Sequence, residues 1–172
     1  MSETVVCFFR TNERPHGAFS QWARAPFELH GTTYVSAEQR MMKAKAELFG
    51  DSVAEAAIMA TQDPQEIKRL GRHVRGFIDT QWRARAVAVV VEANLAKFQQ
   101  NAAMGDVLCA THPHILAEAS PHDRIWGIGL SSQDPRARQR EQWRGLNLLG
   151  EALMRVRETL REERERIPPT CM

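Results

Sequence analysis

Two charged residues stand seven positions apart in a segment that we expect to be helical. Glu38 and Lys45 both fall within residues 36–49, and seven residues are about two helical turns, so the two side chains project from one face. Met41 and Met42 continue that face as core residues, and a carboxylate and an amine beside an apolar stripe can line a pocket. In the simpler interpretation, which the spacing alone favours, Glu38 complements the helix dipole and Lys45 is solvated.

A second group of polar residues lies in a loop that is rich in glycine, aspartate and proline. Asp123, Arg124 and Trp126 stand beside Gly127 and Gly129, and glycine lets the backbone approach a flat ligand closely. Arg124 could hold a phosphate, and Trp126 could stack on a base. An ordinary turn with one anchoring tryptophan explains this pattern equally well.

Asn147, near the start of the last predicted helix, is a third candidate, although taken alone it is better explained as a helix cap. The histidines form no set of ligands, because His112-Pro113-His114 is too stiff for a helical pair and has no cysteine or carboxylate cluster nearby. We therefore predict no metal site. No dinucleotide-binding GxGxxG, GxSxG or phosphate-binding loop occurs either.

The elements that must position these residues indicate an α+β fold, dominated by helices and with a small sheet. Strands are expected at residues 5–9 and 115–119, and a hairpin at 27–34 that turns at His30-Gly31. Ser36 should cap a helix that reaches Phe49, and further helices should cover residues 52–60, 64–71 and 79–100. The last helix should include residues 146–160.

Two of these helices show an apolar stripe at helical spacing. In the helix at 79–100 the stripe consists of Val87, Val91, Leu95 and Phe98. In the last helix it consists of Leu146, Leu149, Leu153, Val156 and Leu160.

Length and composition indicate one globular domain over residues 1–165, followed by a flexible tail at 166–172. The net charge of +2 gives no general reason to bind nucleic acid or an anionic membrane. Three distant cysteines argue against a disulfide framework and a structural zinc site. The apolar run at residues 5–9 is too short for a signal peptide or a membrane span, so we expect a cytoplasmic protein without a membrane partner.

The candidate stretches, in this order, resemble the NADAR family over residues 5–158. Glu38 and Lys45 correspond to the acidic residue and the lysine of one family block. The other matching positions are Gly71-Arg72, Trp82, Phe98, then Glu118, Asp123, Trp126 and Gly127 of a block written E…D-x-x-W-G, and Gly145, Asn147 and Gly150 of a block written G-x-N-x-x-G. Five ordered blocks at compatible distances are a specific signal, and they reverse the preference for a structural interpretation of Glu38 and Lys45.

The sequence departs from the family pattern at two positions. Gln39 stands where many members have histidine, although glutamine also occurs there. In Phe19-Ser20-Gln21, which replaces the usual F-S-N, Ser20 carries over as a substrate-binding residue. Whether Gln21 alters the choice of substrate is left open.

The resemblance implies an N-glycosidase that needs no metal or cofactor. Departure of a nitrogen base from ribose gives the anomeric carbon oxocarbenium character, which Glu38 would stabilise, unless it activates water as a base. Lys45 could instead form a Schiff base with the aldehyde of an opened ribose, and Asp123 could serve as a second acid or base.

The remaining matched residues would bind the substrate. Trp82 and Trp126 would enclose the base, and Arg72 or Arg124 would hold the ribose phosphate. Asn147 would hydrogen-bond the ligand or the loop that bears Asp123. The full set of expected binding residues is Ser20, Arg72, Trp82, Glu118, Arg124, Trp126, Gly127 and Asn147.

Members of the family act on unstable early intermediates of riboflavin synthesis, or remove ADP-ribose from guanine. The resemblance therefore implies a small ribosyl or nucleotide substrate, or ADP-ribosylated guanine in nucleic acid. The near-neutral charge favours the small phosphoribosylamino-pyrimidine. A non-catalytic module that binds NAD or ADP-ribose is the alternative of another class, but such a module could dispense with Glu38 and Lys45. The oligomeric state is left open.

Overall fold

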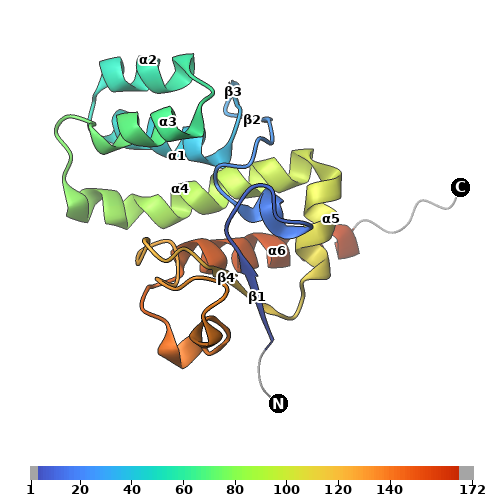
Figure 1. Ribbon diagram of the computed structural model, residues 1–172. Helices are drawn as coiled ribbons and strands as arrows, with labels where there is room; N and C mark the ends of the chain where they lie inside the picture. Colours follow the sequence, from blue (N-terminus) through green and yellow to red (C-terminus); the bar gives the residue numbers. More distant parts are fainter. Residues whose placement is uncertain (1–3, 167–172) are drawn as a thin grey trace, which may run out of the picture. The chain divides into compact units, whose positions relative to one another are not determined.

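The computed structural model describes residues 4–166, and its chain divides into two compact units. One unit, which we call the terminal unit, comprises the residues up to Ser20 and those from Ala102 onward. The other, the central unit, comprises Gln21–Asn101. Arg166 ends the last helix (Figure 1), and the rest of the predicted tail, residues 167–172, lies outside the described residues.

The central unit begins with the predicted hairpin. Strands β2 (Phe27–Leu29) and β3 (Thr32–Tyr34) pair antiparallel, with Phe27 opposite Tyr34. The two residues between the strands, His30 and Gly31, have φ angles of 51° and 73°. A two-residue turn with positive φ at both positions matches the natural twist of paired strands, so His-Gly closes this hairpin as expected.

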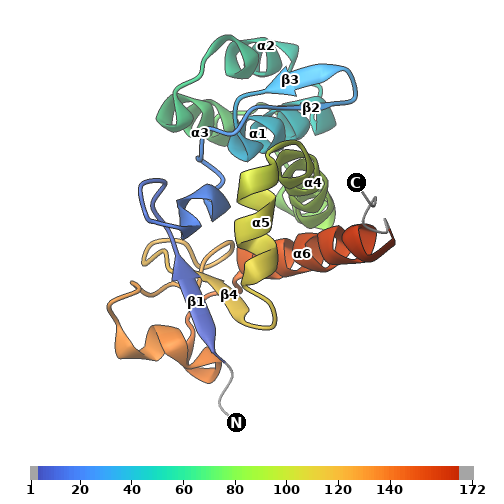
Figure 2. The same cartoon turned by 90° about the vertical axis from the view of Figure 1, so that its right-hand side faces the viewer.

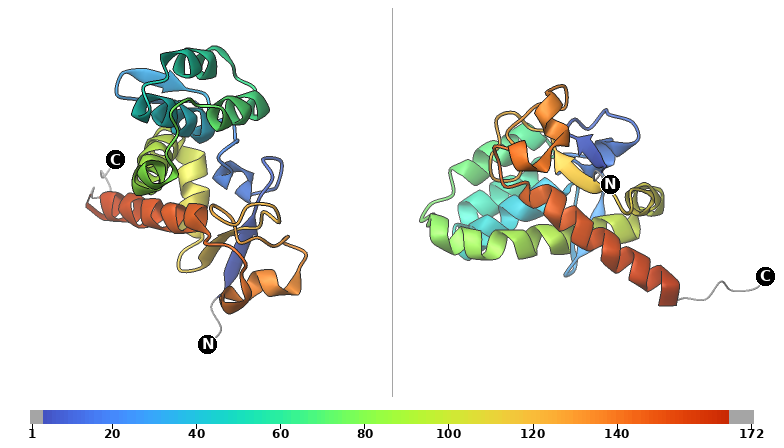
Figure 3. Two further views of the ribbon diagram at one scale, coloured as in Figure 1. Left: turned by 90° about the vertical axis from the view of Figure 1, so that its left-hand side faces the viewer. Right: turned by 90° about the horizontal axis from the view of Figure 1, so that it is seen from below.

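Four helices complete the central unit: α1 (Ala37–Leu48), α2 (Ser52–Ala60), α3 (Pro64–Arg72) and α4 (Asp79–Gln100). The side chains of Ser36, Asp51 and Asp63 cap the first three by accepting hydrogen bonds from backbone N–H groups in the first turn. Helix α1 contacts the other three (Figure 3). All four predicted helices are confirmed, and α1 is the element around which this unit is built.

The predicted apolar stripe of α4 was wrong in part. Phe98 is buried, but Val87, Val91 and Leu95 are only partly buried. The covered face instead includes several small residues, of which Ala93 and Ala96 belong to one buried cluster with Phe27 and Tyr34. Small side chains allow a helix to approach bulky rings closely, which a pattern based on hydrophobicity alone does not reveal.

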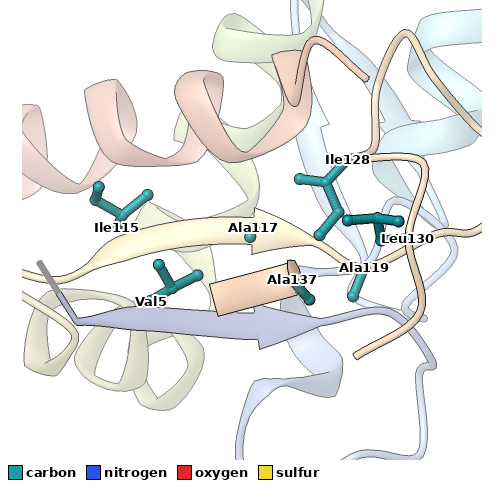
Figure 4. Packing of buried hydrophobic residues seen from close by; sticks show 7 residues of the cluster. All are labelled: Val5, Ile115, Ala117, Ala119, Ile128, Leu130 and Ala137. Carbon is teal, nitrogen blue, oxygen red and sulfur yellow. The ribbon is translucent and has the colours of Figure 1, made fainter. Parts of the chain in front are cut away.

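The terminal unit is organised around two parallel strands, β1 (Val5–Phe8) and β4 (Ile115–Glu118), which lie side by side (Figure 2). Helices α5 (Ala102–Ala110) and α6 (Leu148–Arg166) pack on each other, and α6 also contacts β4. Helix α5 was not predicted from the sequence. Around the strands a core of seven residues (Figure 4) is formed by Val5, Ile115, Ala117, Ala119, Ile128, Leu130 and Ala137.

Helix α6 starts later than predicted. Leu146, the first member of its predicted stripe, precedes the helix and is 64% exposed, whereas Leu149, Leu153 and Leu160 are buried as expected. Asn147 explains the difference, because its φ of 56° is incompatible with a right-handed helix. The described helices include none that is long and apolar enough to cross a membrane.

Candidate active site

Glu38 lies in the first turn of α1 and is only 6% exposed. Its backbone N–H donates to the carbonyl oxygen of Gln21 at 3.0 Å, which fixes the start of the helix against the preceding segment. The positive end of the helix dipole stabilises a carboxylate at this position. A buried carboxylate on a helix start that is fixed in this way is suited to stabilise positive charge on a reacting carbon.

Lys45 lies two turns further along the same helix and is half-buried. Its Nζ donates a hydrogen bond of 2.7 Å to the carbonyl oxygen of Gly71 and lies 4.2 Å from the centre of the Phe77 ring. Burial lowers the pKa of the amine below its ordinary value, and the Arg72 charge lowers it further, whereas the negative charges of Glu38 and Asp79 oppose the shift. A lowered pKa increases the neutral fraction of an amine, which is the form that acts as a nucleophile.

Gly71 allows the two helices that carry this arrangement to approach each other. A Cβ atom at Gly71 would collide with the side chain of Met42 on α1. Without that atom, the end of α3 packs close enough to α1 for the Gly71 carbonyl to reach the Lys45 amine. Gly71 matches a family block, but the sequence predicted no role for it in the site, and no pattern in the sequence pointed to Phe77.

Arg72 and Trp82, the other expected site residues of the central unit, differ in exposure. Arg72 is exposed at the end of α3, where its guanidinium lies near enough to the Lys45 amine to lower its pKa. Trp82 on α4 is only 8% exposed. A ring covered to that extent offers little free surface for stacking on a base, so its expected role remains a prediction.

The two glutamines that depart from the family pattern are both buried and hydrogen-bonded. Gln39 accepts from the backbone N–H of Val35 and donates to the carbonyl oxygens of Ile58 and Thr61, so it joins the start of α1 to the end of α2. Gln21 accepts from Asn94 Nδ2 at 2.7 Å. These contacts are structural ones that a buried amide is suited to make.

In the terminal unit, Asp123 organises the loop that follows β4. Its Oδ1 accepts hydrogen bonds of 2.8 Å from the backbone N–H groups of Ile125 and Trp126. This is a turn in which the aspartate side chain substitutes for a backbone acceptor. The expected acid–base role of Asp123 remains a prediction, and the contacts observed are those of a loop-forming residue.

Glycines let this loop fold back on the end of β4. A Cβ at Gly127 would lie 2.9 Å from the carbonyl oxygens of both Asp123 and Glu118, and one at Gly145 would overlap the Gly127 carbonyl. The loop thus presents Arg124, which is exposed, and Trp126, which is partly buried. Two backbone hydrogen bonds hold the loop in this conformation: the N–H of Ile128 donates to the Glu118 carbonyl, and the N–H of Gly129 donates to the Asp123 carbonyl.

Asn147 is fully buried, and both ends of its side-chain amide bond to strand β4. Its Oδ1 accepts from the Glu118 N–H at 3.0 Å, and its Nδ2 donates to the Leu116 carbonyl at 2.8 Å. The first N–H groups of α6 donate instead to the carbonyls of Ile125 and Trp126, so the interpretation of Asn147 as a helix cap was wrong. The geometry favours a positioning role for Asn147 over the expected direct contact with a ligand.

Ser20, the last expected site residue, follows the 3₁₀ turn η1 (His16–Phe19) of the terminal unit and is 9% exposed.

Lys97 on α4 is a further ionisable group, which was not among the residues predicted from the sequence. Its side chain is fully buried, and burial lowers its pKa to about 7. Within residues 4–166 no three side chains of histidine, cysteine, aspartate or glutamate are grouped so that they could hold a metal ion.

The chain is similar over most of its length to known proteins that are named N-glycosidases. The N-glycosidase R617 of Acanthamoeba polyphaga mimivirus is 42% identical over 164 residues, which cover 91% of this chain and 96% of that protein. The N-glycosidase YbiA of Escherichia coli (strain K12) is 29% identical over 95% of this chain and 93% of its own length.

The fold is similar as well. The NMR structure of the E. coli protein YbiA superposes with a TM-score of 0.80 and 28% identity, covering 100% of this chain and 94% of that one. The observed helix-rich α+β architecture is thus the one that the sequence predicted. The model of the NADAR domain matches residues 7–161, which include every expected site residue. The chain belongs to the NADAR domain family.

Proposed function

We propose that this N-glycosidase hydrolyses the bond between C1 of a ribose and a base-like nitrogen, with a phosphoribosylamino-pyrimidine of riboflavin synthesis as its substrate. The observation that carries the proposal is the pairing on α1 of a buried carboxylate, Glu38, with an amine, Lys45, whose pKa is lowered by burial. These two groups supply a negative charge and a nucleophile, which are the functions that cleavage of an N-glycosidic bond requires.

The enzyme class rests on the relatives. Proteins named N-glycosidase match this chain over more than nine-tenths of its length, which confirms the predicted N-glycosyl hydrolase and argues against a non-catalytic binding module. The identity of the base and of the ribosyl group is our proposal.

The covalent route that we propose uses the Lys45 amine. When the ribose ring of a ribosylamine opens, C1 becomes an imine carbon bonded to the nitrogen of the base. The neutral amine adds to C1, its two protons pass to the nitrogen of the base, and the C1–base bond breaks, so that the base leaves as a neutral amine and C1 is joined to Lys45 by a C1=N bond. Water then hydrolyses the new C1=N bond to Lys45, which releases the sugar aldehyde and returns the amine, so that one water is consumed per turnover.

Glu38 acts in this scheme through its charge. The carbon becomes electron-poor as the base departs, and a fixed carboxylate stabilises it. If Lys45 does not attack, Glu38 is the base that activates water for direct displacement. The exposed Arg72 guanidinium, close to the amine, is suited to hold the ribose phosphate through charge-assisted hydrogen bonds.

The test is to incubate the purified protein with a phosphoribosylamino-pyrimidine and, separately, with ADP-ribosylated guanosine, and to identify the released base by mass spectrometry. We expect release from the first substrate, and no release by Glu38→Gln. Release from the guanine substrate alone would make the protein an ADP-ribosyl hydrolase and overturn the proposed substrate. Tight binding without release of either base would indicate a binding module.

A further inference from the structure

Phe77 is an exposed aromatic residue in the connection between α3 and α4, and its ring lies next to the half-buried Lys45 amine. The side chain is 42% exposed, and the ring centre lies 4.2 Å from the Lys45 amine. The ring also meets that of Phe49 at 5.5 Å in an edge-to-face arrangement. A ring this exposed contributes little to a core, so its position over the amine calls for another explanation.

A contact between Asp51 and Arg75 holds the connection in this conformation. Asp51 is 4% exposed and accepts from the backbone N–H of Arg75 and from its guanidinium, each at 2.8 Å. These bonds hold the pKa of Asp51 well below its usual range, so the carboxylate stays charged. The next residue, Gly76, has a φ of 72° and reverses the chain. After this turn, the Phe77 side chain lies against Lys45 of α1 and Phe49.

The ring has two opposite effects on the amine. Its electron-rich face attracts the ammonium form, which favours protonation. Its bulk excludes water from the amine, which favours the neutral form. Three charged groups act on the same amine: Glu38 from α1 and Asp79 from α4 favour protonation, and Arg72 from α3 opposes it. Burial is the largest influence, so the exclusion of water should outweigh the attraction of the ring.

We propose that Phe77 is a positioning residue for the Lys45 amine, and that the contact of Asp51 with Arg75 holds its ring in place. The ring and the Gly71 carbonyl together fix the amine from two directions. This inference rests on the proposed role of Lys45 for its catalytic meaning, but the positioning itself can be measured without a substrate.

The test is to acetylate the full-length protein with limiting acetic anhydride over a range of pH and to quantify the labelling of Lys45 by peptide mass spectrometry. Only the neutral amine reacts, so the inflection of labelling against pH reports the pKa of Lys45. Lys43 is the internal reference, because it projects from the same helix and is paired with Glu47 and Glu55 instead.

Two substitutions of Phe77 should move the inflection in opposite directions. Phe77→Ala removes the cover, so water reaches the amine and the inflection should rise by about half a pH unit, a threefold change in the neutral fraction. Phe77→Leu keeps most of the cover but removes the aromatic face, so the inflection should fall. Arg75→Ala should raise it by a smaller amount, whereas the matched variant Arg69→Ala, which breaks an exposed pair with Glu66, should leave it unchanged.

Shifts of Lys45 in the same direction for alanine and leucine, or no shift in either folded variant, would overturn the positioning role. If Phe77→Ala does not fold, Phe77→Leu and Arg75→Ala still decide between the outcomes. Failure of the proposed function has a different signature. The labelling shifts would appear as expected, while no base would be released from the phosphoribosylamino-pyrimidine, or its release would have the same pH profile in all variants.

Discussion

The Lys45 amine and the Gly71 carbonyl oxygen are joined by a hydrogen bond of 2.7 Å, which ties the candidate nucleophile on α1 to the end of α3. The two helices can approach closely enough for this bond because Gly71 has no side chain. The side chain of Met42 fills the space that a Cβ atom at position 71 would occupy. Because the acceptor is a backbone carbonyl on α3, the position of the Lys45 amine depends on how closely α1 and α3 pack. A change in the packing of α1 against α3 should therefore also change the reactivity of Lys45.

Gly71→Ala should destabilise the protein and reduce turnover together. The added methyl group must displace Met42, and overpacking of this kind costs about 1–3 kcal/mol. Denaturant unfolding and the rate of base release measure the two effects. Adding Met42→Ala to the variant restores space, so the double variant should regain part of both. A glycine variant with normal stability and normal turnover would contradict this account.

Glu38→Gln should keep the fold and lose most of the turnover. The amide preserves the shape of the side chain but removes the charge, and loss of one pre-organised charge should cost on the order of 10²-fold in kcat. Glu66→Gln, a charge removed from an exposed carboxylate of the same unit, is the control and should be fully active. Near-normal kcat in a folded Glu38→Gln protein would remove Glu38 from the mechanism.

The sequence predicted the secondary structure of the central unit closely because its signals are local. Ser36, Asp51 and Asp63 cap helices that begin directly after them, and His30-Gly31 forms the turn that its residue types favour. No long-range information was needed for these elements.

The errors arose where tertiary contacts decide the structure. Asn147 resembles a helix cap in sequence, but its amide bonds to β4, whose residues are about 30 positions away. The covered face of α4 depends on the rings of the hairpin, which its own periodicity cannot reveal. The family motif made Lys45 a candidate site residue. Phe77, which contacts Lys45 from another element, carried no signal in the sequence because that contact is a tertiary one.

Asn147→Ala should destabilise the terminal unit without a specific effect on substrate affinity. It leaves a buried N–H of Glu118 and a buried carbonyl of Leu116 without their partner, at about 1–3 kcal/mol for each group. Asn147→Gly tolerates the positive φ equally well or better, so a similar loss of unfolding free energy in both variants assigns the effect to the hydrogen bonds. A raised KM at unchanged stability would show instead that Asn147 touches the ligand.

Trp126 and Trp82 should respond differently to substitution by alanine. Trp126 is partly exposed in a glycine-rich loop, so we expect a raised KM, by an amount equivalent to about 1–3 kcal/mol of stacking, and a nearly unchanged melting temperature. Trp82 is 8% exposed, and its loss should instead lower the melting temperature. Collapse of stability in Trp126→Ala would make that residue a core anchor and end its assignment to the substrate.

The covalent role of Lys45 predicts a permanent adduct. Borohydride added during turnover should reduce the imine between C1 and the amine, and the mass of the sugar should appear on the peptide that contains Lys45. Because burial lowers the pKa of this amine, trapping should reach its plateau at a lower pH than an ordinary lysine would require, and should decline as the pH falls and the amine becomes protonated. Lys45→Arg should abolish trapping, since a guanidinium stays protonated.

Lys43 is the built-in control for this experiment. Its pKa is raised, because its hydrogen bonds to Glu47 and Glu55 outweigh the opposing effect of burial. It should therefore remain protonated and unmodified, and Lys43→Arg should trap normally. An adduct mapped to Lys43, or full activity in Lys45→Arg, would exclude covalent catalysis by Lys45. Direct attack by water with Glu38 as the base would then be the mechanism, and Glu38→Gln would still abolish turnover.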